Sequence, residues 1–215
     1  VGVEGILRAM FNPDMKSRNF IIPGIIAIIM AIIMAILTSL TIVKEREKGT
    51  LEQLIVTPVK AHELMLGKII PYWLIGMLDM LLVVLAGVLV FNVPLKGNVV
   101  FLFGATGIFA LSGLGMGLVI STLADSQQLA NQLAMVLALL PSFILSGFMF
   151  PIKSMPDVLQ WVSSLIPARY FLVILRGIFL KGSGPVVLAF ELLMLTAFGL
   201  ILITIASIKF EKRLK

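Results

Sequence analysis

The stretch FIIPGIIAIIMAIIMAILTSLTIV, Phe20 to Val43, contains no charged residue in 24 positions. A helix needs about 20 predominantly apolar residues to cross the hydrocarbon core of a bilayer. The stretch that follows, KEREKGTLEQLIVTP from Lys44 to Pro58, places six charged residues in its first nine positions. This abrupt change predicts that a membrane-spanning helix ends near Val43 and that the chain then enters water.

The composition of the chain fits lipid better than water as its surroundings. Of its 215 residues, 60% are hydrophobic and 13% are charged, whereas a soluble domain carries about 25% charged residues. The net charge is +6, but the basic residues are spread over connecting segments and flanks. Because no basic run is interleaved with aromatic residues, the positive balance indicates membrane topology and argues against nucleic-acid binding.

Few residue types that carry out chemistry are present. The sequence has no Cys and one His, which excludes disulfides, thiol chemistry and a His-rich metal site within one chain. It contains no Gly-x-x-x-x-Gly-Lys-Ser/Thr motif, so the chain does not hydrolyse ATP itself. Its polar loops show no His-based triad and no carboxylate pair of the kind that a membrane hydrolase uses. We therefore expect no catalytic residue, no cofactor and no metal ion.

Five apolar runs are long enough to cross a bilayer: 20–43, 69–91, 99–123, 129–150 and 185–208. Each is expected to be a helix, because in lipid every backbone polar group must be paired within its own segment. The predicted fold class is therefore an all-α integral membrane protein with five transmembrane helices.

Residues 150–184 follow a different pattern. Their best apolar run, Tyr170 to Leu180, has 11 residues and is interrupted by Arg176, which makes it too short to span a bilayer. Pro156 is expected to open one short helix, and Pro167 to separate it from a second. We predict two short extracytoplasmic helices here that are either interfacial or re-entrant.

Five spans place the two ends of this domain on opposite sides of the membrane. The first loop, 44–68, holds five Lys or Arg residues, and the tail KFEKRLK, 209–215, holds four in seven positions. Cytoplasmic flanks carry an excess of Lys and Arg. We therefore place 44–68 and the tail in the cytoplasm and 150–184 outside.

The first loop carries signals that end one helix and start another. Gly49 can end the first helix in a left-handed conformation, and Thr50 with Gln53 forms a capping box for a helix over 51–56. So short a helix is marginal by itself. Its apolar side chains share one face at helical spacing, and they are Leu51, Leu54 and Ile55. This face packs on the bilayer surface, on the chain's own helix ends or in a groove on a cytoplasmic partner.

One carboxylate lies inside the second apolar run, Asp79 in GMLDMLLVV. A charge at that depth costs a few kcal/mol, and for this reason intramembrane acids are often functional. One reading is a proton or cation site. The other is a protonated or water-facing Asp that hydrogen-bonds a neighbour in a helix bundle.

The third apolar run contains LSGLGMG, in which Gly113 and Gly117 form a GxxxG motif. Such a pair permits two helices to approach closely. The close contact is either between two copies of the chain or between helices of one chain.

Several stretches together resemble the permease subunits of ABC-2 type ABC exporters. They are VKEREKGTLEQLIVTP (43–58), ELMLGKIIPYWLIGMLDMLLV (63–83), GLVISTLADSQQLANQ (117–132) and the segment that begins LPSFILSGFMFPIK (140–153). The resemblance covers nearly the whole chain in the family's order, and the basic tail belongs to it.

In such permeases the stretch EREKGTLEQL is a cytoplasmic coupling helix that docks on the ATPase. The resemblance assigns this coupling role to Glu45, Arg46, Glu47, Gly49, Thr50, Leu51, Glu52 and Leu54, to which the shared apolar face adds Ile55. It also implies that residues 20–215 are an ABC-2 transmembrane domain and that 1–19 end an extracytoplasmic region. The family's first helix and most of that region are then expected upstream of Val1. Members often hold a neutral amide near the position of Asp79, so Asp79 departs from the pattern.

The resulting prediction is a permease subunit of an ATP-driven exporter in a bacterial or archaeal inner membrane. It is expected to form the translocation pathway as a dimer, homo- or heterodimeric, with a cytoplasmic ATPase and the lipid bilayer as its other partners. The alternative is an ion-coupled secondary transporter or channel that uses Asp79. Apolar span walls do not distinguish drugs, lipids and polysaccharides, so the sequence does not indicate the substrate.

Overall fold

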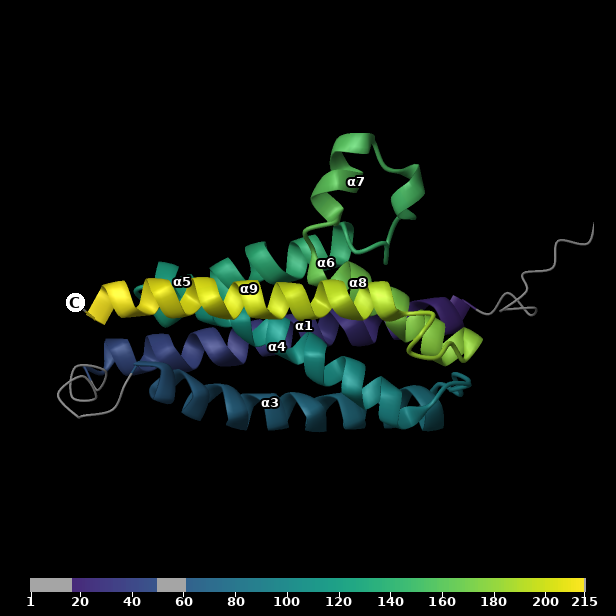
Figure 1. The fold of residues 1–215 in the computed structure, drawn as a ribbon, viewed down its shortest axis with the longest axis horizontal. Helices are drawn as coiled ribbons and strands as arrows, with labels where there is room; N and C mark the ends of the chain where they lie inside the picture. The colour runs from purple at the N-terminus through teal and green to yellow at the C-terminus, as the bar shows by residue number, and fades with distance from the viewer. Residues whose placement is uncertain (1–16, 50–60, 215) are drawn as a thin grey trace, which may run out of the picture.

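The computed structural model is an elongated bundle of helices (Figure 1). It describes residues 17–49 and 61–214. The long helices are α1 (Ser17–Glu47), α3 (Ala61–Leu85), α4 (Val99–Leu123) and α9 (Ala189–Leu214). The shorter helical segments are η1 (Ala86–Val90), α5 (Gln127–Ala134), η2 (Met135–Leu139), α6 (Leu140–Ile144), η3 (Ile152–Ser154), α7 (Asp157–Ser163), α8 (Pro167–Arg176) and η4 (Gly177–Lys181). Every regular element in the described ranges is helical, which confirms the all-α fold class.

Among the described residues, four helices are long and apolar enough to cross a membrane, and they coincide with four of the predicted runs. They are Ser17–Glu47, Gly67–Val90, Val99–Leu123 and Ala189–Lys209. The start of α4 shows why such a helix begins where it does. The side chain of Asn98 accepts hydrogen bonds from the backbone N–H groups of Val100 (2.7 Å) and Phe101 (3.2 Å), which pairs two donors that the helix leaves free.

The remaining predicted run, 129–150, is not one helix. The chain is helical from Gln127 to Ile144, where α5 passes through the π-helical segment η2 into α6. Residues 145–150 form turns and bends, with Gly147 at a left-handed φ of +84°. The expected end of the helix at 150 is wrong, because run length records apolarity and not the point where the backbone turns. From here residues 145–166, which we call the arm, leave the bundle sideways (Figure 1).

After the arm the chain returns to the bundle as α8 and η4. The axis of α7 makes an angle of 84° with that of residues 167–181. Phe171 and Ile174 of α8 are fully buried, and the ring of Phe171 stacks on that of Phe109 in α4 with centroids 4.0 Å apart. The apolar side chains of α8 thus pack into the core of the bundle, which fits a re-entrant segment. The choice between interfacial and re-entrant positions, and the total number of crossings, stay predictions.

Two prolines set the helices on either side of the turn between α7 and α8, as predicted. Pro156 is the N-cap residue of α7, and Pro167 is the first residue of α8. Arg169 of α8 then holds α7 in place. Its Nη1 donates to the carbonyl oxygen of Gln160 (3.2 Å) and to Oγ of Ser163 (2.6 Å).

Gly113 and Gly117 bring α4 close to α1 within one chain. A Cβ atom at Gly113 would lie 2.7 Å from Cβ of Met34, and one at Gly117 would lie 2.6 Å from the carbonyl oxygen of Ala35. Gly115 allows the same close approach to α9 on the other side of α4. Of the two readings of the GxxxG motif, packing between helices of one chain is therefore confirmed.

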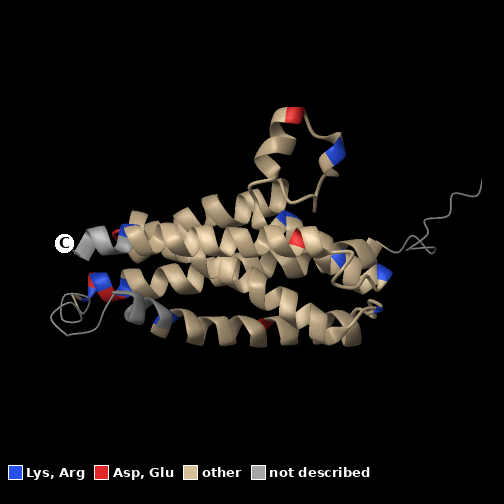
Figure 2. Ribbon diagram, viewed as in Figure 1, with Lys and Arg blue, Asp and Glu red and all other residues tan. Residues whose placement is uncertain are grey.

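Charged residues gather near the two ends of the bundle and on the arm (Figure 2). The C-terminal ends of α1 and α9 lie at one end of the bundle (Figure 1). The turns that precede α4 and α9 lie at the other end. This arrangement agrees with the predicted topology, in which the first loop and the tail share one side of the membrane.

Thiol labelling tests this topology. A Cys at Lys60 should react with a membrane-impermeant maleimide only in inside-out vesicles, and a Cys at Lys181 only in intact cells. The 215 residues contain no native Cys, so each variant adds the single thiol of this segment. Labelling of both positions from the same side would contradict the topology.

Candidate functional site

Helix α1 continues out of the bundle through the charged stretch Lys44–Glu47, as the sequence predicts. The backbone N–H of Lys48 donates to the carbonyl oxygen of Lys44 at 3.1 Å, and that of Gly49 to the carbonyl oxygen of Arg46 at 3.0 Å. Gly49 has a φ of +69°, the left-handed conformation that glycine adopts without a steric penalty at helix ends. The predicted cap at Gly49 is confirmed.

Glu45 connects the end of α1 to α3. Its carboxylate forms an ion pair with Nζ of Lys68. The two side chains are only 30% and 13% exposed, respectively, so water screens this pair less than a fully exposed one. The contact ties the C-terminal end of α1 to α3.

Arg46 connects the end of α1 to the end of α4. Its Nη1 donates to the carbonyl oxygen of Ala124 at 2.6 Å and lies 3.8 Å from the carboxylate of Asp125. Ala124 is the C-cap residue of α4. The last carbonyl groups of a helix carry partial negative charge, which a cation stabilises.

Glu47 connects the end of α1 to the start of α5. Its carboxylate accepts the backbone N–H of Gln127 at 2.7 Å and also the side-chain amide of Gln127. Gln127 is the first residue of α5, whose N-cap residue Ser126 accepts the backbone N–H of Leu129 at 3.2 Å. Free N–H groups and partial positive charge at a helix N-terminus favour an anion there.

These contacts of Glu45, Arg46 and Glu47 form what we call the α1 junction. Sequence reasoning missed their partners, which are Lys68, Ala124, Asp125 and Gln127. The sequence offers one signal for them, the polar triplet Asp125–Gln127 after the apolar run 99–123. The predicted topology places this triplet on the same side of the membrane as the first loop. The other residues expected in coupling lie outside the described residues, namely Thr50, Leu51, Glu52, Leu54 and Ile55. Docking of this segment on an ATPase stays a prediction.

Asp79 lies in α3, at a position that is neither buried nor fully exposed. Its Oδ2 is buried and has no hydrogen-bond partner among the described residues. The described part of the chain also shows no group of three or more His, Cys, Asp or Glu that could hold a metal ion. This isolation argues against a cation site, because cation sites gather several oxygen ligands. It also leaves Oδ2 without the hydrogen-bonded neighbour that the second reading expected, so the role of Asp79 stays a prediction.

We expect Asp79→Asn to keep most of the transport activity. Asn preserves the size of the side chain and its capacity to hydrogen-bond, and it carries no charge in the membrane. Transport in vesicles, normalised to the amount of inserted protein, measures the effect. If the variant inserts normally but does not transport, an ion-coupled mechanism that uses Asp79 is favoured.

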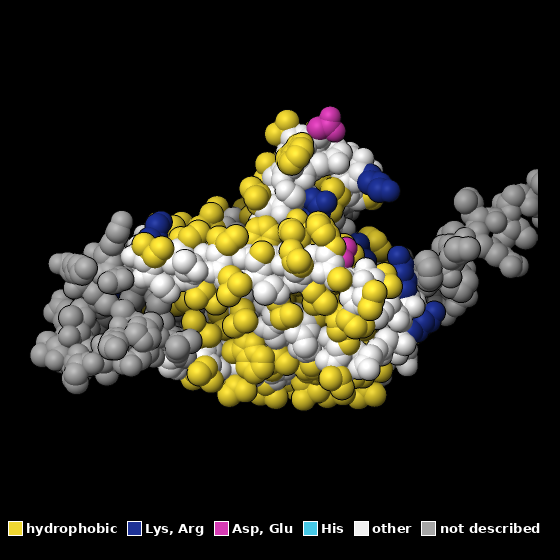
Figure 3. All heavy atoms as spheres, viewed as in Figure 1, with side chains coloured by type: hydrophobic (Ala, Val, Ile, Leu, Met, Phe, Trp, Pro, Cys, Tyr) yellow, Lys and Arg dark blue, Asp and Glu magenta, His cyan; other side chains and the backbone are white. Residues whose placement is uncertain are grey.

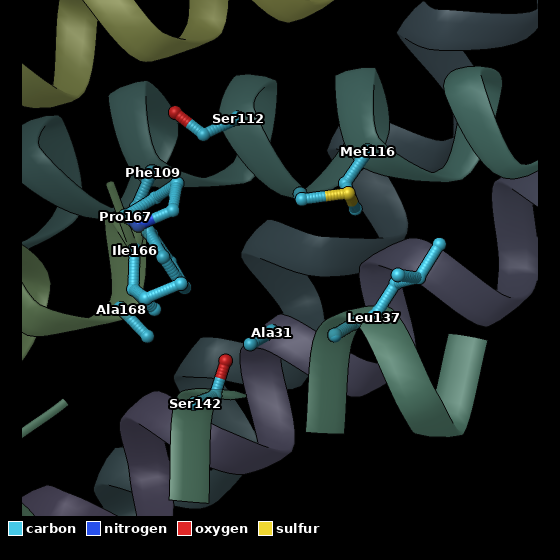
Figure 4. A pocket seen from close by; sticks show the side chains of 11 residues that line it. Ala31, Phe109, Ser112, Met116, Leu137, Ser142, Ile166, Pro167 and Ala168 are labelled. Atoms are coloured by element: carbon cyan, nitrogen blue, oxygen red, sulfur yellow. The ribbon is translucent and has the colours of Figure 1, made fainter. Parts of the chain in front are cut away.

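A small, largely apolar pocket of about 30 Å³ lies where η2 and α6 meet the start of α8 (Figure 4). It is lined by Ala31 of α1, Phe109 and Met116 of α4, Leu137 of η2 and Pro167 of α8. The pocket thus lies beside the π-helical segment and the turn between the arm and α8.

A second hollow, open to the surface and of about 690 Å³, runs between α3 and α4. Trp73 of α3 donates its indole N–H to the carbonyl oxygen of Gly107 in α4 at 2.9 Å, which fixes the ring at one wall.

The visible side of the bundle is largely covered by hydrophobic side chains (Figure 3). Such a surface suits contact with hydrocarbon or with other apolar helices.

Arg176 links the end of α8 to the base of the arm. Its guanidinium lies 3.8 Å from the ring centroid of Phe20 in α1, and its Nη1 donates to the carbonyl oxygen of Gly147 at 3.2 Å. Arg176 is the charge that interrupts the apolar run of 170–180. The sequence showed the interruption, and the structure shows that Arg176 connects α8, α1 and the arm.

The described helices thus form a multi-pass membrane domain with a charged junction at one end. Residues 3–208 match the family described as "ABC-2 family transporter protein". The chain belongs to this family of ABC transporter permeases.

Three relatives from Escherichia coli (strain K12) illustrate the similarity. The chain is 47% identical over 207 residues to "Probable multidrug ABC transporter permease YbhS", which covers 96% of this chain and 55% of that protein. It is 32% identical over 181 residues to "Probable multidrug ABC transporter permease YbhR", covering 84% of this chain and 49% of that protein. It is 33% identical over 213 residues to "Inner membrane transport permease YhhJ", covering 95% of this chain and 55% of that protein. The chain thus spans about half the length of these relatives.

Proposed function

We propose that this chain forms most of the membrane domain of an ATP-driven export permease. The observation that carries the proposal is the family match over residues 3–208, to which the capped, charged end of α1 adds a place for coupling. A separate subunit is proposed to supply ATP hydrolysis, because the relatives are named as permeases.

The proposed assembly has two permease subunits and a pair of cytoplasmic ATPase subunits in a bacterial or archaeal inner membrane. The segment 44–58 docks on the ATPase, with the apolar face of Leu51, Leu54 and Ile55 in a groove of that partner. Residues 1–19 end an extracytoplasmic region, and 20–215 form the transmembrane domain. The dimer completes the translocation pathway, since two facing bundles can enclose a wider passage than the pocket of about 30 Å³ within one bundle.

Lipophilic, drug-like compounds are the proposed substrate class. The names of two relatives contain the word "multidrug", and the walls of the pocket and of the groove between α3 and α4 are mainly apolar. A lipophilic cation such as ethidium is therefore a suitable first transport probe.

Co-purification tests the proposed partnership. The full-length permease that contains this chain, with an affinity tag, is co-expressed with the ATPase encoded beside it and purified in mild detergent. We expect the ATPase to elute with the permease and to hydrolyse ATP faster in its presence. A permease that purifies alone, although both proteins are expressed and inserted, would overturn the proposal.

One observation favours a second candidate, an ion-coupled transporter. The buried Oδ2 of Asp79, without a hydrogen-bond partner among the described residues, is a group that could exchange a proton. This candidate needs no ATPase and gives the segment 44–58 no task. The Asp79→Asn experiment and the co-purification separate the two candidates.

A further inference from the structure

The α1 junction joins two cytoplasmic turns that are far apart in the sequence. Arg46 contacts Ala124 across 78 positions, and Glu47 contacts Gln127 across 80. Only Ala124, Asp125 and Ser126 separate α4 from α5. Two neighbouring side chains of α1 therefore hold both ends of this short turn.

We propose that Arg46 and Glu47 act as a clamp that makes the turn between α4 and α5 follow the end of α1. A displacement of residues 50–58, the part of the proposed docking segment 44–58 that follows the clamp, is thereby passed to α5. This inference rests on the proposed function, in which an ATPase docks on the segment 44–58; in the clamp, residues 50–58 make the docking contacts and Arg46 and Glu47 hold α4 and α5. Arg46 and Glu47 are positioning residues in this account, since they act through the helix ends that they hold.

The charges of the clamp complement the helix ends that they contact. Arg46 donates to a carbonyl oxygen at the C-terminal end of α4, where partial charge is negative. Glu47 accepts an N–H at the N-terminal end of α5, where partial charge is positive. Exchanging the two side chains, by Arg46→Glu together with Glu47→Arg, would place each charge against the wrong helix end. The order of the two charges along α1 thus matches the order of their partners, with Arg46 at the end of α4 and Glu47 at the start of α5.

The clamp is close enough to the docking segment to respond to it. Only Lys48 and Gly49 separate Glu47 from residue 50. The backbone hydrogen bonds from Lys48 to Lys44 and from Gly49 to Arg46 hold these two residues in a turn that caps the helix. A force on residues 50–58 is therefore expected to reach Glu47 through this hydrogen-bonded turn.

The contact between α1 and α5 is apolar up to the clamp. Its buried side chains include Ala35 and Val43 of α1 and Ala130 and Ala134 of α5, with the partly buried Ile36, Leu40 and Leu133 packed against them. Apolar packing is not directional, whereas the two hydrogen bonds from Gln127 to Glu47 are. These bonds therefore orient the start of α5 on the end of α1.

The clamped helix leads to the parts of the fold that can rearrange. α5 continues into the π-helical segment η2 and then into α6, which ends at the arm. A π-helical turn inserts an extra residue into the helix, and such turns occur at functional sites. η2 also lines the apolar pocket through Leu137 and Ala138. A tilt of α5 at its clamped end is thus expected to change the pocket and the base of the arm.

The test uses the full-length permease with its ATPase in proteoliposomes. We expect Glu47→Ala to lower the ratio of ethidium transported to ATP hydrolysed by at least about fivefold, the lower range of coupling between sites, with the ATPase still bound. Gln127→Ala removes only the side-chain hydrogen bond and should cause a smaller drop. The double variant should be no worse than Glu47→Ala alone. Gln128→Ala, at the exposed neighbouring position, is the matched control and should leave the ratio unchanged.

Three results are distinguishable. A normal ratio for Glu47→Ala with the ATPase bound would overturn the clamp and leave the proposed function intact. Loss of the ATPase from Glu47→Ala would make Glu47 a docking residue, which also overturns the clamp. Failure of the unmodified permease to bind any ATPase would instead overturn the proposed function.

A covalent cross-link between positions 47 and 127 provides a second test. Its expected result would not follow if Glu47 only stabilised the fold. The pair Glu47→Cys and Gln127→Cys introduces two thiols into a segment without native Cys. Because the clamp is expected to stay closed through the cycle, joining the thiols with a short bifunctional methanethiosulfonate should restore the ratio that the unlinked pair loses. Reduction of the link should remove the gain. A linked protein that transports less than the unlinked one would show that the contact must open, contrary to the proposal.

Discussion

Gly117→Val is expected to prevent the bundle from packing and to leave little folded permease in the membrane. A Cβ atom at this position would lie 2.6 Å from the carbonyl oxygen of Ala35 and 2.7 Å from Cβ of Thr38, both in α1. The first of these is a backbone atom, so the clash cannot be relieved by a side-chain rotation. Forcing α1 and α4 apart should cost roughly 3 kcal/mol, which is a large part of the stability of a single domain.

The matched control for this variant lies on the same helix. A Cβ atom at Gly104 would meet nothing within 4 Å, so Gly104→Val should leave the melting temperature nearly unchanged. Fluorescence-detected gel filtration of detergent-solubilised protein after a temperature series measures both variants. Equal melting temperatures for the two would mean that α1 and α4 do not make this close contact.

Leu54→Asp is expected to abolish docking of the ATPase. If Leu54 lies in a groove of that partner, the change buries an unpaired carboxylate there, at a cost of about 3 kcal/mol or more. A loss of that size weakens the complex more than about a hundredfold. Co-purification of the ATPase and substrate-stimulated ATP hydrolysis should both fall to background at normal membrane insertion.

The other face of the predicted helix 51–56 provides the control. Gln53 is polar and would lie about 150° around that helix from the middle of the apolar face, so Gln53→Asp adds the same charge without placing it in the groove. It should keep most of the bound ATPase. If Leu54→Asp also keeps it, the apolar face packs on the bilayer surface or on the chain's own helix ends, where a charge turns toward water.

Local signals in the sequence predicted much of the fold. The length of the uncharged run after Arg18 predicted α1, and the charged stretch with Gly49 predicted how that helix ends. Pro156 and Pro167 placed the starts of α7 and α8. Each of these features depends on a few neighbouring residues, which is why sequence alone was sufficient.

Features that depend on distant residues could not be predicted in the same way. The apolar run 129–150 contains no charge that marks the end of the helix at Ile144, and Arg176, 29 positions away, contacts the turn at Gly147. The burial of α8 depends on partners such as Phe109, which lies 62 positions from Phe171. The partners of Arg46 and Glu47 lie 78 and 80 positions away. No periodicity or capping rule connects residues across such distances.

The central claim is that ATP hydrolysis on a partner subunit, and not an ion gradient, drives transport through this chain. The most direct test is uptake of ethidium into inside-out vesicles that contain the full-length permease and its ATPase, measured with a protonophore present. We predict uptake that requires ATP and the ATPase, survives the protonophore and persists in Asp79→Asn. Uptake that proceeds without the ATPase, follows an imposed proton gradient and disappears in Asp79→Asn would contradict the account.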